Sequence, residues 1–197
     1  NNVTFRSQSG EADSVIVTYI SGSTADNYVV KIWEAPYFSF EDITFWNQGT
    51  SYAYCAHIWG SDSISFDGCK FNTVNNAYAY NAQGINAYSY NNGTYLSSDY
   101  LTITNCEFDG GYFNLYYYNY SSAGDYGDHS VIENNKFMNA YYYGAYVYYA
   151  TDLQFNNNYA AGTNINAYGY AMYISYTTNG SISNNFVEGN ATWPRVG

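Results

Sequence analysis

Short segments in which apolar and polar residues alternate recur along the chain at intervals of 26 to 32 residues. In these segments the first and third positions are apolar, the second is polar or Tyr, and the fourth is Trp or Tyr in five of the six. The segments are Val30-Lys31-Ile32-Trp33, Ala56-His57-Ile58-Trp59, Ile85-Asn86-Ala87-Tyr88, Phe113-Asn114-Leu115-Tyr116, Ala145-Tyr146-Val147-Tyr148 and Met172-Tyr173-Ile174-Ser175. A period of two residues is typical of a strand with one buried face. We therefore predict one strand in each segment.

Two further sets of apolar positions follow each predicted strand. The first set contains Phe38 and Phe40, Ile64 and Phe66, Leu101 and Ile103, and then Ile132, Phe155 and Ile182. The second set contains Phe45, Phe71, Phe108, Phe137, Tyr159 and Phe186. A polar bend rich in Asn and acidic residues separates the two sets. Because Asn tolerates left-handed backbone angles and can hydrogen-bond its equivalent in the next unit, we expect these bends to stack.

Each unit contains three short predicted strands and no helical connection, which predicts an all-β fold, a parallel β-solenoid. In such a fold each unit forms one coil, and equivalent residues stack from coil to coil. About seven coils fit into a single domain, residues 1–197, if a less regular first coil contains residues 3–5 and 15–17. Leu occurs only four times, which argues against an α-rich fold. With 22% aromatic and only 11% charged residues, the composition also argues against disorder.

The units, such as residues 101–108, resemble the right-handed parallel β-helix repeat of pectate-lyase-like proteins. Tyr-rich coils such as residues 143–149 are similar to those of long secreted surface proteins of Bacteroidota. The resemblance implies a right-handed parallel β-helix over nearly the whole chain. It implies no particular activity, because this fold hosts lyases, hydrolases, adhesins and inert spacers.

The charge balance excludes several partners. A net charge of -11 with only five basic residues argues against binding to nucleic acid and to anionic membranes. No run of about 18 apolar residues is present, so we expect no membrane insertion. The first residues read as mature sequence or as part of an excised segment rather than as a signal peptide. We expect an extracellular or cell-surface location.

The fourth positions of the first strands form an outward aromatic row. The row comprises Trp33, Trp59, Tyr88, Tyr116 and Tyr148, and Tyr117, Tyr149 and Tyr176 widen it. Rings aligned one coil apart stabilise a solenoid by stacking. An exposed apolar row is also typical of a contact surface for sugar rings or for a partner protein. The sequence leaves both interpretations open.

Catalytic chemistry finds little support in the sequence. Lyases of this fold combine calcium-binding carboxylates with an Arg or Lys base, and we expect no outward row that pairs a basic residue with clustered carboxylates. We interpret Glu41, Asp42 and Asp67 as caps of the bend, and His57 and His129 as structural residues. The turn from Asp125 to Asp128 could chelate calcium, although a solvated turn fits its few ligands better. We expect no enzyme activity, no catalytic residue and no other cofactor.

Cysteines and glycan acceptors indicate possible covalent modifications. Cys69 and Cys106 fall in one column on successive coils, so we expect their Cα atoms to lie about 5 Å apart. At this distance the two residues can form a disulfide or remain as two buried thiols, and the sequence leaves both alternatives open. The Asn-x-Ser/Thr pattern of N-glycosylation occurs at Asn2, Asn92, Asn119, Asn179 and Asn190. Ser14 and Ser63 lie in tripeptides that resemble the O-glycosylation acceptor of Bacteroidota.

Neither end of the predicted solenoid carries a recognisable capping helix. Because open coils expose strand edges and core residues, we expect a segment of a longer solenoid or a subunit whose ends dock on neighbours. The resulting hypothesis is an extracellular structural or adhesive solenoid, a filament subunit or stalk segment that associates end to end and carries glycans. The alternative is a carbohydrate-binding or polysaccharide-degrading domain that uses the aromatic row.

Overall fold

The computed structural model describes residues 2–74, 81–91, 94–119, 126–162 and 169–188. Three parallel sheets, here called A, B and C, wind around one axis. Sheet A contains β1 (Val3–Arg6), β4 (Phe38–Glu41), β7 (Ile64–Asp67), β12 (Thr102–Thr104), β16 (Val131–Glu133), β19 (Gln154–Asn156) and β22 (Ser181–Ser183). Sheet B contains β2 (Ile16–Tyr19), β5 (Thr44–Asn47), β8 (Lys70–Asn72), β13 (Glu107–Asp109), β17 (Lys136–Met138), β20 (Tyr159–Ala161) and β23 (Phe186–Glu188).

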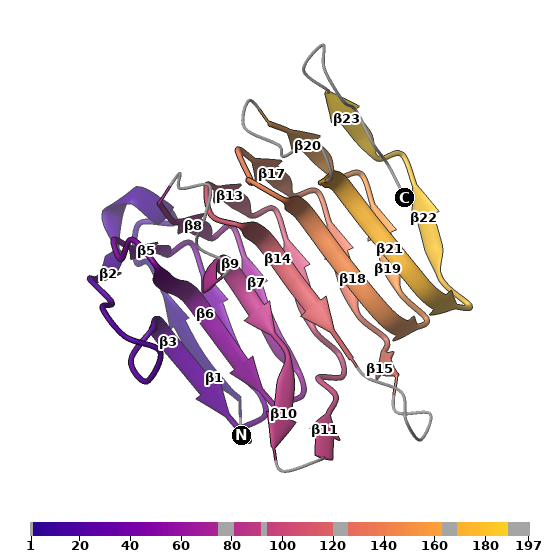
Figure 1. The fold of residues 1–197 in the computed structure, drawn as a ribbon, viewed down its shortest axis with the longest axis horizontal. Coiled ribbons are helices and arrows are strands. Elements are labelled where there is room, and N and C mark those ends of the chain that lie inside the picture. The colour runs from indigo at the N-terminus through magenta and orange to yellow at the C-terminus, as the bar shows by residue number, and fades with distance from the viewer. Residues whose placement is uncertain (1, 75–80, 92–93, 120–125, 163–168, 189–197) are drawn as a thin grey trace.

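Sheet C carries the longest strands and the Tyr-rich segments. It contains β3 (Tyr28–Trp33), β6 (Tyr52–Trp59), β9 (Asn81–Ala87), β14 (Phe113–Tyr118), β18 (Tyr143–Thr151) and β21 (Tyr170–Thr178), with the short β15 (Gly127–Asp128) beside β18. The chain passes from sheet C to A to B in each complete coil, and the coils follow one another from β1 to β23 (Figure 1). The predicted parallel solenoid with three strands per coil is confirmed.

Two local elements depart from the repeat. A short 3-10 turn, η1 (Ala12–Ser14), widens the corner between β1 and β2. An antiparallel hairpin of β10 (Ser89–Asn91) and β11 (Thr94–Leu96) follows β9 and projects from the solenoid (Figure 1). The repeat in the sequence did not predict this hairpin, because the hairpin occurs in only one of the connections between sheets C and A.

Stacked apolar residues fill the interior. Phe40, Phe66, Ile103, Ile132 and Phe155 follow one another in sheet A, and Phe45, Phe71, Phe108 and Phe137 do so in sheet B. The rings of Phe71 and Phe108 stack at 4.7 Å with an interplanar angle of 14°. The sequence pattern assigned all of these positions to the core, and their burial supplies most of the stabilisation. The pattern was wrong for Tyr159 and Phe186, because Ala160 and Val187 take the inward positions of their strands.

The polar bends between sheets A and B stack as expected. Asn105, Asn134, Asn157 and Asn184 have positive φ angles of 54–58°, which Asn adopts more readily than most residues. The residue after three of these bends forms an asparagine ladder of Asn135, Asn158 and Asn185. Asn135 Nδ2 donates to Asn158 Oδ1 at 3.0 Å, and Asn158 Nδ2 donates to Asn185 Oδ1 at 3.1 Å. The ladder ties successive coils together inside a corner where backbone groups would otherwise lack partners.

Candidate functional site

The outer surface of sheet C is a largely aromatic face, built from three columns of residues that succeed one another from coil to coil and interrupted on β9 by Gln83 and Asn86. The first column is Tyr28, Tyr54, Gln83, Phe113, Tyr143 and Tyr170. The second is Lys31, His57, Asn86, Tyr116, Tyr146 and Tyr173. The third is Trp33, Trp59, Tyr88, Tyr118 and Tyr148. None of these described positions is Asp or Glu, although the chain carries a net charge of -11.

The structure corrects one member of the predicted aromatic row. Tyr118, and not Tyr116, continues the row, because Tyr118 pairs with Tyr148 and Tyr116 pairs with Tyr146. The physical reason is Tyr117, which the sequence analysis placed outside. Its side chain is fully buried, and its hydroxyl lies 2.8 Å from both the Ser98 carbonyl oxygen and Ser130 Oγ. With Tyr117 inside, its two neighbours must both face outward.

Stacking covers ring faces where the aromatic face crosses β14, β18 and β21. Tyr118 and Tyr148 stack at 5.1 Å with an interplanar angle of 4°, and Tyr146 and Tyr173 stack at 5.1 Å with an angle of 9°. Such columns present ring edges and hydroxyl groups to solvent. The geometry therefore matches a stabilising ladder more closely than a platform for sugar rings, which stack on open ring faces.

The end of the face at β3 is more open. The Trp33 side chain is 54% exposed, and the Lys31 ammonium lies 3.9 Å from the centroid of its ring. Burial, with a smaller contribution from the charge of Lys31, lowers the pKa of His57 to about 4. His57 is thus neutral near pH 7 and packs between Tyr54 and Trp59 as a structural residue.

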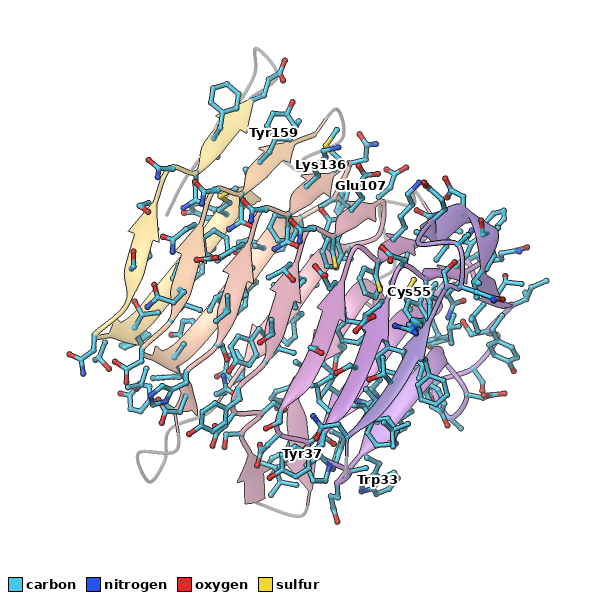
Figure 2. The ribbon with its side chains drawn as sticks, turned by 180° about the vertical axis from the view of Figure 1, so that it is seen from behind. Trp33, Tyr37, Cys55, Glu107, Lys136 and Tyr159 are labelled. Carbon is cyan, nitrogen blue, oxygen red and sulfur yellow. The ribbon has the colours of Figure 1, made fainter. Side chains whose placement is uncertain are left out.

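A charged row on the outer surface of sheet B combines basic and acidic groups, but each of its lysines contacts a single carboxylate rather than the clustered carboxylates of a lyase site. Lys70, Glu107 and Lys136 succeed one another by register, and Lys136 Nζ lies 2.5 Å from Glu107 Oε1. Tyr159 follows in the same row (Figure 2). Lys70 Nζ lies 2.7 Å from Asp13 Oδ2, and this hydrogen bond raises the pKa of Lys70. A lysine held protonated by a carboxylate is a poor general base.

His129 bridges two carboxylates at the corner before sheet A. Its Nδ1 lies 2.7 Å from Asp128 Oδ1 and its Nε2 lies 3.6 Å from Asp152 Oδ2. One ligand atom from each residue falls within 4.8 Å of the others, so the trio could hold a divalent cation. Asp125, the other predicted calcium ligand, lies outside the described residues. Sequence analysis missed Asp152, although His129 and Asp152 both stand three residues before a predicted core position.

The acidic bend caps the corner, as interpreted from the sequence. Glu41 and Asp67 are neighbours in register, and Asp67 Oδ1 accepts hydrogen bonds from Thr104 Oγ1 at 2.8 Å and from Asn105 Nδ2 at 2.7 Å. This carboxylate is therefore used in tying two coils together.

The three cysteines, Cys55, Cys69 and Cys106, are free buried thiols in the structure. Cys69 and Cys106 occupy neighbouring coils, because Lys70 pairs with Glu107. Of the two alternatives that the sequence left open, the structure contains the thiol form. Burial raises the pKa of Cys55 to about 12, so this thiol is unreactive near neutral pH.

The predicted glycan acceptors differ in accessibility. Asn2, Ser14 and Asn179 are exposed and Ser63 is half-buried, whereas Asn92 and Asn190 lie outside the described residues. Asn119 is only 1% exposed, and its Oδ1 accepts a hydrogen bond from the Ser98 amide. This burial argues against modification of Asn119 in the folded chain.

Both outermost coils leave apolar side chains exposed. At the first coil these are Val3, Phe5, Ile16 and Val17, and at the last coil they are Ile182 and Phe186. A hollow of about 580 Å³ lies beside β3. Among the described residues β3 is the first strand of sheet C, so no strand covers this side of it. Phe5, Val30, Ile32 and Phe38 line the walls of the hollow.

Comparisons with known proteins agree with the fold. The family model described as right handed beta helix region matches residues 28–193. No curated protein and no solved structure matches the chain. Among the described residues, no helix has the length and apolar character needed to cross a membrane.

Proposed function

We propose that this chain, which belongs to the right-handed β-helix family, is an extracellular structural solenoid that joins end to end with further copies into a filament or stalk. The observation that carries the proposal is the exposure of apolar residues on both outermost coils. Phe5 and Ile16 at one end are 49% and 53% exposed, and Ile182 and Phe186 at the other are 54% and 60% exposed. Solenoids need caps or neighbours at such positions.

Two observations support a structural rather than a catalytic role. The lysines of the charged row are paired with carboxylates, as a structural ion-pair row would have them. The aromatic rings of sheet C stack on one another. In this proposal both features stiffen the solenoid, and exposed acceptors such as Ser14 and Asn179 carry glycans at the surface.

Electron microscopy tests the proposal directly. We expect the concentrated chain to form rods of uniform width and variable length. Phe186→Asp should prevent rods, because it places a charge in the proposed end contact. Tyr100→Asp is the matched control: Tyr100 is 51% exposed at mid-solenoid, and its φ of 55° suits Asp. Separate single particles for the unaltered chain, or rods that survive Phe186→Asp, would contradict the proposal.

A second candidate function is the binding of neutral carbohydrate at the β3 end of the aromatic face. The supporting observation is the 54% exposure of Trp33, in a face whose described column positions include no Asp or Glu. Trp33→Ala should abolish retention on neutral polysaccharides, whereas Tyr146→Ala, in a stacked column, should preserve it. Equal retention of both variants would exclude Trp33 as the contact.

A further inference from the structure

We infer that the two ends of the solenoid are the complementary halves of one junction, in which β22 and β23 of one copy pair in parallel with β1 and β2 of the next. This inference rests on the proposed function and specifies its partner surfaces. The partner is thus a second copy of this chain, bound head to tail, and a head-to-tail contact that does not close gives a filament.

Sheet A carries one unbroken register from end to end. Phe5, Phe40, Phe66, Ile103, Ile132, Phe155 and Ile182 follow one another as inward residues of successive strands. Only the first and last of these are exposed, and the ring of Phe5 already stacks on Phe40 at 5.4 Å. If the register continues across the junction, Ile182 covers the open side of Phe5. The outward Ser181 then lies beside Thr4.

Sheet B provides an independent observation on its outward side. The outward column begins with Ile16, ends with Phe186, and contains Lys70, Glu107 and Lys136 in its middle. Apolar residues on the outside of a solenoid have no core to enter, yet they stand here at both ends of a charged column. Phe186 stacks on Tyr159 at 5.8 Å on one side, and a junction places Ile16 of the next copy on the other.

Among the described residues, no further strand pairs with the outer edges of the first and last coils. β1 and β2 are the first strands of sheets A and B, and β22 and β23 are the last. An unpaired edge is a template for another chain, and soluble proteins often protect it with Pro or Lys. None of these four strands contains either residue, and their only charged residues are Arg6 at the end of β1 and Glu188 at the end of β23. Because all strands of a sheet run in parallel, a head-to-tail copy continues each hydrogen-bond ladder without reversal.

The hollow beside β3 fits the same arrangement. Its lining includes Phe5 and Val17 of β1 and β2, the strands at the end at which the next copy docks. Docking therefore removes this apolar hollow from water, in addition to the exposed residues of β1 and β2.

Paired cysteines test the register. In the double variant Thr4→Cys with Ser181→Cys, the two sulfur atoms meet across the junction, because neighbouring parallel strands bring Cα atoms about 5 Å apart. Mild oxidation should give a series of covalent multimers that reducing agent dissolves. In the matched control, Thr4→Cys with Ser183→Cys, the pair is displaced by two residues, roughly 7 Å along the strand, and should give none. The native cysteines are buried, and the unaltered chain under the same oxidation is the blank.

The outcomes separate the junction from the proposed function. Suppose that light scattering shows assembly, but Thr4→Cys/Ser181→Cys forms no covalent multimers or the displaced control forms as many. The proposed register is then wrong, whereas end-to-end association is still supported. If the chain neither assembles nor cross-links, both are overturned. Multimers of the first variant alone support the junction.

Discussion

The hydroxyl group of Tyr117 lies 2.8 Å from the Oγ of Ser130 in the interior of the solenoid. It lies at the same distance from the carbonyl oxygen of Ser98, to which it donates. Tyr117 is the middle residue of three consecutive tyrosines, and its burial places Tyr116 and Tyr118 outside. Two hydrogen bonds thus allow a large polar side chain to enter an apolar core and fix the register of the aromatic face.

Replacing Tyr117 with Phe should lower the free energy of unfolding by about 2 kcal/mol, because Ser98 and Ser130 lose a buried partner. Tyr118→Phe is the matched control, since the Tyr118 ring faces outward, and should change it by less than about 0.5 kcal/mol. Urea unfolding followed by tyrosine fluorescence measures both. Equal effects of the two substitutions would contradict the inward position of Tyr117.

Alternation of apolar residues was sufficient to predict the inward positions of sheet A through β19 and of sheet B through β17, where Phe and Ile mark one register. It assigned Tyr159 and Phe186 to the core wrongly, because Ala160 and Val187 continue the inward column of sheet B. It was insufficient at residues 113–118, where an aromatic run allows two registers that differ by two residues. The choice between them depends on partners of the Tyr117 hydroxyl that stand 19 and 13 residues away. Loops of variable length supply these partners, so no periodicity reveals them.

The charged row was within reach of the sequence. Lys70, Glu107 and Lys136 each stand one residue before an aligned Phe, so the alignment of core positions also aligns the lysines with the glutamate. The partner of Lys70 could not be found in this way. Asp13 lies in the irregular corner of the first coil, where the repeat supplies no register.

Substitution of Asn158 tests the asparagine ladder. Its Oδ1 accepts from both the backbone amide and the side-chain amide of Asn135, and its Nδ2 donates to the carbonyl oxygen of Ile132 at 2.8 Å. Asn158→Ala leaves these buried groups unpaired, and we expect a loss of about 3 kcal/mol in the free energy of unfolding. Asn157→Gly, at an exposed residue with a φ of 57°, should cost less than about 1 kcal/mol in the same urea titration. Similar losses for the two variants would refute the ladder's role.

The lowered pKa of His57 predicts a pH dependence of stability. The unfolded chain binds a proton at this residue below about pH 6.5, whereas the folded chain resists protonation down to about pH 4. The free energy of unfolding should therefore fall by about 3 kcal/mol as the pH decreases from 6.5 to 4. Other groups titrate in this range, so the measurement is the difference from His57→Asn. Asn is a suitable replacement because Asn86 occupies the same column. Parallel pH profiles would contradict the burial of His57.

The most direct test of end-to-end association mixes two chains that are each blocked at one end. Ile16→Asp blocks the first coil and Phe186→Asp blocks the last, both at exposed outward positions. By light scattering, each variant alone should remain at the single-chain mass of 22.2 kDa. An equimolar mixture should reach twice that mass and no more, because only one pair of intact ends remains. A mixture that stays at the single-chain mass while the unaltered chain assembles would contradict the head-to-tail contact.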